Sequence, residues 1–272
     1  MKTKIRFDSL ELGLIVLFVS LLAYQAGRLR AAEDQKLQTN EWLHPEDIAL
    51  QQQLRRRYGP QRYSAHLEEW IVRDFFQDMR GGVFADIGAW KWKDENNTLA
   101  LEQQLGWSGI AVDAVADYAQ DWRANRPRSQ FVVAFIDSVD GQPRTMDVPM
   151  LAPQIASAHD NDNMHRTYAA YEGKVRKVHT TSATLDTVLD RANIAKLDFL
   201  SLDIELQEPA ALAGFSVARF RPRLVCVEAH PPARQQIIDY FAHHDYAVVG
   251  RYLRLDSSNL YFAPLPVSPA QP

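Results

Sequence analysis

The stretch Val83–Asp113 constrains the fold most strongly, because it contains a strand, a turn, a helix and a second strand in succession. Its first apolar run contains Asp86 and is followed by Gly88, its helical pattern covers Asn96–Leu105, and its second apolar run ends at Asp113. A strand–helix–strand unit of roughly 30 residues is the size of one parallel crossover. Because ligands bind beyond the carboxyl ends of strands in open α/β sheets, we expect a ligand site at this edge.

The residue types at this edge suit a nucleotide-like ligand. Gly88 lets the backbone come close to a ligand where a Cβ would obstruct it. The carboxylate of Asp113 can accept hydrogen bonds from both hydroxyls of a ribose. The pattern G-x-G-x-x-G is absent, since Ala-Trp-Lys-Trp follows Gly88, so NAD(P) binding is not expected. The simpler alternative is that Asp86 caps a loop and Gly88 only makes a turn.

The rest of the chain continues the alternation of strands and helices. Further apolar runs lie at Phe131–Phe135, Leu197–Leu202 and Arg223–Glu228, and Tyr246–Tyr252 with Asn259–Phe262 predicts a closing antiparallel pair. Helical patterns cover Ser64–Met79, Tyr118–Asn125, Thr184–Asn193 and Ala233–His243. We therefore expect an α/β fold with a mostly parallel, Rossmann-like sheet flanked by helices.

The N-terminal region carries a charge-free run, Leu12–Gly27, between basic residues. It predicts a transmembrane anchor over 9–27 after a short tail at 1–8. A signal peptide is the alternative, but Tyr24-Gln25-Ala26 puts a bulky residue where a cleavage site needs a small one. We expect a single-pass membrane protein with the side of its domain undetermined, a stem with one short helix at 28–62, a domain at 63–264 and a loose tail at 265–272.

Composition excludes several classes of function. The net charge of −4 over 272 residues lacks the excess of basic residues that is typical of nucleic-acid-binding proteins. A single cysteine rules out an intramolecular disulfide framework. The irregular segment Gly141–Lys177 is the expected substrate region, because loops at a strand edge usually carry specificity. Its polar run His159–Asn163 lacks the glycine and the terminal glutamate of a calcium loop, so we expect a solvated loop and no metal there.

An ordered set of motifs between Val83 and Ala263 resembles the FkbM family of S-adenosylmethionine (SAM)-dependent methyltransferases. The motifs are VFADIGA, LGWSGI, TLDTVLDRANIAKLDFLSLDIE, PRLVCVE and SNLYF. The resemblance implies the class I methyltransferase fold, a seven-stranded sheet whose last strand is antiparallel. It also implies that Asp86, Gly88 and Ala89 lie by the methionine part of SAM. Further implied positions are Asp113 at the ribose, Asp137 beside the adenine, and Asp203, Glu205 and Glu228 in the reaction cleft.

The chain departs from the family pattern at two positions. Trp92 stands where a second glycine is usual in the first loop, and with Trp90 and Lys91 it is expected to crowd the turn that holds SAM. Leu206 stands where a glycine usually follows the acid pair of the motif D-x-E-G. Both departures fall in the cofactor and reaction region.

Three functions follow from these features. The first is a membrane-anchored methyltransferase for a hydroxyl group of a glycan, lipid-linked or other small acceptor. Glu228 and His230, or Asp203 and Glu205, would accept the hydroxyl proton; for His230 the alternative is a surface residue before a proline. The second is a degenerate member that binds no SAM and serves as a membrane-tethered binding or escort protein. The third is another enzyme that holds a divalent ion on Asp203 and Glu205.

Overall fold

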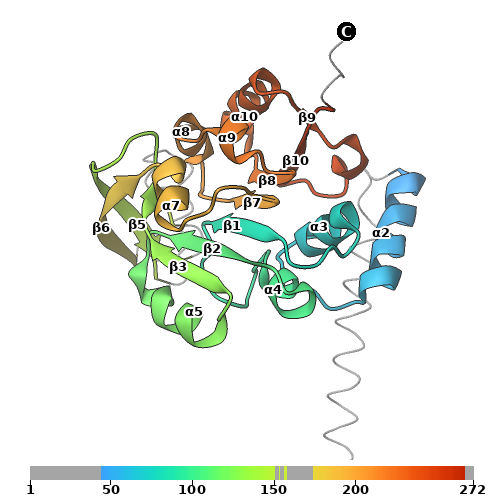
Figure 1. The fold of residues 1–272 in the computed structure, drawn as a ribbon, viewed down its shortest axis with the longest axis horizontal. Coiled ribbons are helices and arrows are strands. Elements are labelled where there is room, and N and C mark those ends of the chain that lie inside the picture. Colours follow the sequence, from blue (N-terminus) through green and yellow to red (C-terminus); the bar gives the residue numbers. More distant parts are fainter. Residues whose placement is uncertain (1–43, 151–152, 154–155, 158–173, 267–272) are drawn as a thin grey trace, which may run out of the picture. The chain divides into compact units, whose positions relative to one another are not determined.

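The computed structural model describes residues 44–150, 153, 156–157 and 174–266 (Figure 1). The predicted transmembrane run, the first part of the stem and the polar run 159–163 lie outside these residues. The chain divides after Leu50 into two units, and residues 44–50 of the first unit include the start of α2 (Pro45–Tyr58). Among the described helices, none is both long and apolar enough to cross a membrane. This finding overturns the single-pass localisation predicted above.

Seven strands form the central sheet in the order β3-β2-β1-β7-β8-β10-β9. The neighbours from β3 to β8 pair in parallel, whereas β10 runs antiparallel to both β8 and β9. This arrangement confirms the mostly parallel sheet with an antiparallel closing pair. The strands are β1 (Val83–Ile87), β2 (Ser108–Asp113), β3 (Ser129–Val133), β7 (Phe199–Leu202), β8 (Leu224–Glu228), β9 (Tyr246–Val248) and β10 (Asn259–Pro264).

Helices cover both faces of this sheet (Figure 1). Residues of α7, α8, α9 and α10 share one buried apolar cluster with Ala85 and Ile87 of β1. Phe84 and Asp86 point to the opposite face, since side chains alternate along a strand, and α3, α4 and α5 lie on that side. The helices are α3 (Glu68–Phe76), α4 (Leu99–Leu105), η1 (Ala116–Tyr118), α5 (Ala119–Asn125), α7 (Leu185–Arg191), α8 (Glu208–Ala213), α9 (Val217–Phe220), α10 (Pro231–His243) and η3 (Gly250–Tyr252).

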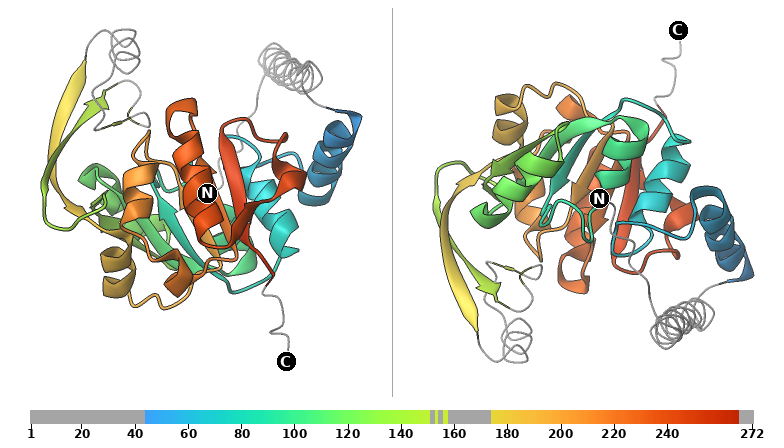
Figure 2. Two further views of the ribbon diagram at one scale, coloured as in Figure 1. Left: turned by 90° about the horizontal axis from the view of Figure 1, so that it is seen from above. Right: turned by 90° about the horizontal axis from the view of Figure 1, so that it is seen from below.

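The segment expected to be irregular instead contains a β-hairpin, which stands at one edge of the domain in Figure 2. Its strands are β5 (Pro143–Pro149) and β6 (Val175–Ala183), which pair antiparallel along their length. The pattern was missed because β6 is largely polar, with its buried residues only at its end. β6 also pairs with β4 (Phe135–Ile136), so the single strand predicted at this point is divided between two sheets at Ala134.

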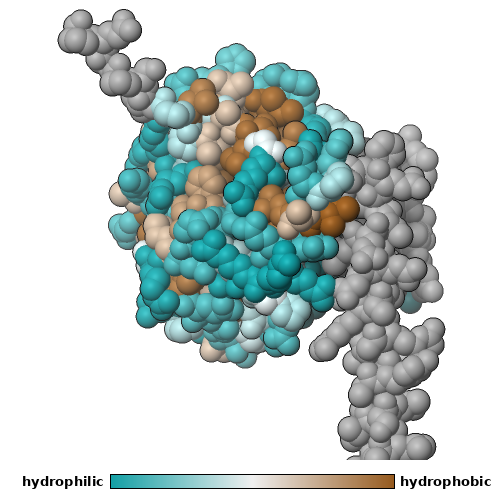
Figure 3. All heavy atoms as spheres, turned by 90° about the vertical axis from the view of Figure 1, so that its right-hand side faces the viewer, coloured by the Kyte–Doolittle hydropathy of each residue, from teal (hydrophilic) through white to brown (hydrophobic). Residues whose placement is uncertain are grey.

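The surface of the domain carries few large apolar side chains. Figure 3 shows hydrophobic residues between hydrophilic ones on the face that it views. Among the described residues, the exposed large hydrophobics belong to separate segments of the chain: Val133, Val139, Met150, Leu253 and Leu265. Single exposed apolar residues of this kind are normal for a globular protein.

Gly88 follows β1 and lies against the backbone of Asp203, which follows β7. Its φ is +82°, and a Cβ at this position would lie 1.7 Å from the carbonyl oxygen of Asp203. In addition, the amide of Asp203 donates to the carbonyl of Ile87, at 3.0 Å. The glycine is therefore required for a close approach of two backbones, and the reason given from sequence, approach to a ligand, is not needed to explain it.

We expect Gly88→Ala to lower the free energy of unfolding by roughly 3 kcal/mol or more, because it adds both a backbone clash and left-handed strain. Gly106→Ala is the matched control, with φ +70° and no atom within 4 Å of the added Cβ. It should cost only about 1 kcal/mol. Denaturant unfolding of both variants checks this, and equal losses would contradict the clash.

Candidate active site

A pocket opens at the carboxyl ends of β1, β2, β4 and β7. The space between its walls is about 600 Å³, which includes open solvent at its mouth. Gly88 and Asp113 line it on one side, and Asp203 and Glu205 on another. Its apolar wall comes mainly from the end of β2 and from the segments that follow β2 and β3: Val112, Ala114, Val115, Ala134, Phe135 and Ile136.

Asp113 ends β2 with both carboxylate oxygens fixed by backbone amides. Oδ2 accepts the amide of Trp90 at 2.9 Å, and Oδ1 accepts the amide of Val115 at 2.8 Å. Burial raises the pKa of Asp113 to about 6, although these two hydrogen bonds favour the ionised form. The group is thus mainly ionised at neutral pH, and its remaining lone pairs can accept hydrogen bonds from a diol.

Asp86 and Ala89 lie behind the pocket and are not among the residues that line it. Oδ2 of Asp86 accepts hydrogen bonds from the hydroxyl of Thr98 at 2.9 Å and from the amide of Asn96 at 3.2 Å. Burial raises the pKa of Asp86 to about 6 against these hydrogen bonds. The side chain of Ala89 packs with Ala111 on the same side. Both residues therefore hold the first loop from the side that faces away from the pocket.

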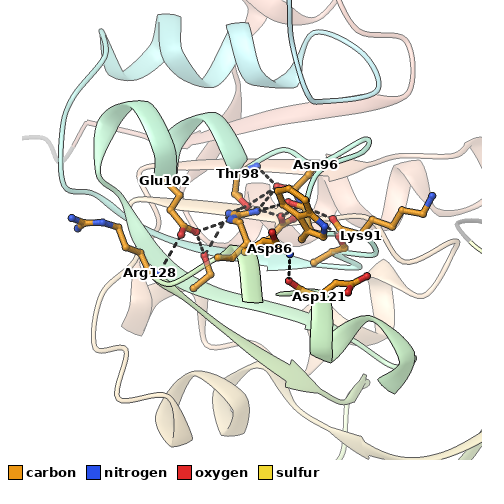
Figure 4. A network of polar contacts seen from close by, with 12 residues as sticks. Asp86, Lys91, Asn96, Thr98, Glu102, Asp121 and Arg128 are labelled. Atoms are coloured by element: carbon orange, nitrogen blue, oxygen red, sulfur yellow. Dashed lines mark hydrogen bonds and ion pairs between the residues drawn. The ribbon is translucent and has the colours of Figure 1, made fainter. Parts of the chain in front are cut away.

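The buried guanidinium of Arg126 holds this loop in place as part of a polar network, in which Figure 4 labels Asp86, Asn96, Thr98 and Glu102. It lies 2.7 Å from Glu102 and donates to the carbonyl of Trp92 and to Oδ1 of Asn96, each at 3.0 Å. It also donates to the Thr98 hydroxyl at 3.0 Å. Sequence reasoning missed Arg126, because an arginine between an asparagine and a proline at the end of a helix resembles any surface position.

Of the three bulky residues in the first loop, only Trp90 lines the pocket. Trp92 packs against the cluster of Ala89, Ala111 and Trp122. Lys91 is exposed, and its Nζ lies 4.3 Å from the centre of the Trp90 ring. The expectation that all three crowd the turn is therefore wrong for Trp92 and Lys91.

Asp137 is buried but is not among the residues that line the pocket. Its Oδ2 lies 2.6 Å from Nε of Arg144 on β5, and its Oδ1 accepts the amide of Ser138. The carboxylate thus anchors the β5–β6 hairpin. The pocket wall at this point is formed by Phe135 and Ile136, which precede Asp137 on β4.

The hairpin region also contributes to the pocket, through Met146, Pro153, Ala156 and Ser157. Ser157 is buried, and its hydroxyl donates to the carbonyl of Glu205 at 3.1 Å. This contact links the inserted segment to the loop after β7. The segment in which substrate residues were expected therefore does reach the pocket, although no sequence signal distinguished Ser157.

An acidic cluster adjoins the pocket at the ends of β7 and β8. Nε2 of His230 lies 3.0 Å from Oε1 of Glu228 and 3.9 Å from Oε2 of Glu205. Asp203 opens into the pocket, and Glu208 is fully buried with Oε1 accepting the amide of Ile204 at 2.9 Å. The four acids and the histidine come together although they are spread over 28 positions from Asp203 to His230.

The protein around this cluster raises the pKa of each acid. Burial raises the pKa of Glu205 to about 8, with further contributions from the charges of Asp203 and Glu208. Burial likewise raises the pKa of Glu208 to about 7 and, with the charge of Asp203, lifts that of Glu228 far above its usual range. The pKa of Asp203 is also raised by its surroundings, although its side chain faces the pocket. Several carboxylates thus share one poorly solvated region.

The loop after β7 has a left-handed backbone at two consecutive residues. Glu205 has φ +55° and Leu206 has φ +75°, in a region that favours glycine. Leu206 stands where the family pattern has glycine, and its side chain packs against the main apolar cluster. The substitution therefore keeps the backbone geometry at the cost of local strain.

Comparison with known proteins gives one family. The model of the methyltransferase FkbM domain matches residues 83–248, more than half of the 272-residue chain. No curated protein matches the chain.

Several solved structures are similar in fold at low identity. A TehB-like SAM-dependent methyltransferase from Corynebacterium glutamicum is 11% identical with a TM-score of 0.40, over 80% of this chain and 97% of that one. A precorrin-6y C5,15-methyltransferase from Geobacter metallireducens is 11% identical with a TM-score of 0.39, over 72% and 86%. The 1,6-didemethyltoxoflavin-N1-methyltransferase of Burkholderia thailandensis, solved with S-adenosylhomocysteine, is 11% identical with a TM-score of 0.34, over 97% and 94%.

The strain at Leu206 can be measured by comparing Leu206→Gly with Leu206→Ala. Both variants lose the packing of the leucine, but only glycine relieves the strain of the left-handed backbone. The free energy of unfolding of Leu206→Gly should therefore be about 1 kcal/mol higher than that of Leu206→Ala. The same pair at the exposed Gln235 of α10 is the control, where glycine should be the less stable by about 1 kcal/mol. Denaturant unfolding gives both differences, and an alanine variant as stable as glycine at position 206 would argue against strain.

Asp86 should make the protein less stable as pH rises. Its folded pKa of about 6 exceeds the ordinary value of 3.8, so the folded state binds this proton more tightly than the unfolded state. The stabilisation is complete below about pH 4 and is lost as pH rises through about 6, which amounts to about 3 kcal/mol. Asp86→Asn should lack this part of the pH dependence in unfolding measured from pH 4 to 7. Parallel profiles for the two proteins would contradict the raised pKa.

Proposed function

The chain belongs to the FkbM methyltransferase family, whose cofactor is SAM, and we propose that it methylates a hydroxyl group of a small acceptor. Glycans and lipid-linked sugars fall within this class, because they present hydroxyl groups. The observation that carries the proposal is the position of the acidic cluster. Asp203 and Glu205 line the same pocket as Asp113, so groups suited to a ribose and to a hydroxyl proton lie at one cavity.

The residues of the pocket fit SAM. Asp113 would accept the ribose hydroxyls, while Val115, Phe135 and Ile136 offer an apolar wall for the adenine. Gly88 presents a surface without a side chain at the end of β1. The ring of Trp90 adds apolar surface next to Gly88. Because Trp90 alone of the three bulky loop residues lines the pocket, the pocket remains open.

Bound SAM supplies an electrophilic methyl group on a sulfonium. The remaining work is done by positioning, which excludes water and brings the acceptor oxygen in line with the methyl group. We assign to Asp203 the acceptance of the hydroxyl proton, because its side chain opens into the pocket. Glu205, Glu228 and His230 surround this position from the ends of the two strands.

Calorimetric titration of SAM into the protein tests the cofactor site first. We expect binding in the wild type and at least tenfold weaker binding in Asp113→Ala, because two ribose hydrogen bonds are lost. Asp203→Asn should bind SAM as the wild type does. It should also lose methyl transfer to a panel of hydroxylated acceptors assayed with labelled SAM, at least a hundredfold.

Thermal unfolding should show that both variants are folded. A folded wild type that binds no SAM would favour the alternative of a non-catalytic binding protein, in which Trp90 closes the site. Full methyl transfer by Asp203→Asn would reject the assignment of the proton acceptor while leaving the cofactor site intact.

A further inference from the structure

The ends of β7 and β8 bring together a mixed set of metal-binding groups. One ligand atom each from Glu205, Glu228 and His230 lies within 4.8 Å of the other two. Glu228 and His230 come from the end of β8 and the start of α10, while Glu205 comes from the loop after β7. Carboxylate oxygen and imidazole nitrogen together form a donor set that divalent transition metals favour.

The charges of this cluster lack basic partners. Among the described residues, no lysine or arginine forms an ion pair with Asp203, Glu205, Glu208 or Glu228. The basic groups near these acids in the described part of the chain are two histidines: His66, whose charge lowers the pKa of Asp203, and His230, whose side chain is 42% exposed. Buried carboxylates either keep a proton or pair with a cation, and a divalent ion that displaces the protons would give this cluster the counter-charge that lysine and arginine do not supply.

Two buried carboxylate oxygens point to the same conclusion independently of the ligand geometry. Within the described part of the chain, Oε2 of Glu228 and Oε2 of Glu208 are buried and have no hydrogen-bond partner. Glu208 is 0% exposed, and its other oxygen, Oε1, accepts the amide of Ile204 at 2.9 Å. One oxygen of this fully buried acid is therefore left without a partner next to the loop that carries Glu205.

The distances agree with a small ion bound between the three groups. In an octahedral site with ligands about 2.1 Å from the ion, adjacent ligands lie about 3.0 Å apart and opposite ligands about 4.2 Å apart, whereas in a tetrahedral site all ligands lie about 3.4 Å apart. The distances of His230 Nε2 from Glu228 Oε1 and from Glu205 Oε2, 3.0 and 3.9 Å, fall at and between these values. Only small side-chain adjustments are then needed to bring the three atoms onto one ion.

We propose that Glu205, Glu228 and His230 bind one divalent transition-metal ion, Mn²⁺ or Zn²⁺, beside the acceptor end of the pocket. Three protein ligands leave coordination positions open, and Glu205 lines the pocket. An acceptor hydroxyl could therefore bind the ion and lose its proton more readily. This use of the ion rests on the proposed methyl transfer, whereas binding of the ion does not.

Titration with Mn²⁺, followed by the loss of the electron paramagnetic resonance signal of the free ion, tests the site. The full chain is used without a histidine tag and after dialysis against a chelator. We expect one Mn²⁺ per chain, and at least tenfold weaker binding in Glu205→Gln and in His230→Ala. Saturating Mn²⁺ should also raise the Tm of the wild type more than that of either variant.

His243→Ala is the matched control, since this exposed histidine ends the helix that His230 precedes, about 20 Å away. It should bind Mn²⁺ as the wild type does, and so should Asp113→Ala, which separates failure of the metal site from failure of the SAM site. If His230→Ala does not fold, Glu205→Gln carries the test. A wild type that binds no Mn²⁺, or ligand variants that bind it with unchanged affinity, would overturn the proposal.

Discussion

The buried guanidinium of Arg126 is the interaction on which the geometry of the site depends. Its ion pair with Glu102 and its hydrogen bonds to Trp92, Asn96 and Thr98 fix both sides of the first loop. Burial lowers the pKa of Arg126, while Glu102 favours its charged form. Breaking a buried pair of this kind typically costs about 3–5 kcal/mol. The loop amide that fixes Asp113 comes from Trp90, so the position of the ribose-type carboxylate depends on an arginine on the far side of the loop.

The sheet could be predicted because its strands are buried and carry near-continuous apolar runs. The same reasoning fails where a strand is exposed: β6 is mostly polar, so periodicity gives no signal for it. It also fails at Ala134, because an uninterrupted apolar run does not reveal that its two halves pair in different sheets. That division places Phe135 and Ile136 in the pocket wall and leaves Asp137 paired with Arg144.

The site was predictable to the extent that it follows from strand ends. Asp113, Asp203 and Glu205 line one pocket because parallel strands present their carboxyl ends at one edge. Contacts made across the chain could not be foreseen in this way. Arg126 donates to the carbonyl of Trp92 in the first loop across 34 residues, and Ser157 reaches Glu205 across 48 residues. Contacts between residues so far apart in the sequence produce no hydrophobic periodicity from which they could be predicted.

The two departures from the family pattern differ physically. Trp92 replaces a usual glycine where the backbone does not require one, because the left-handed residues of the first loop are Gly88, Trp90 and Glu95. Leu206 replaces a usual glycine at a backbone that is left-handed, with φ +75°. A residue other than glycine costs about 1–2 kcal/mol there. The loop keeps its shape because Leu206 packs into the apolar cluster and Ser157 holds the carbonyl of Glu205. The strain is thus balanced by contacts that also aim Glu205 at the pocket, so the departure is compatible with a working site.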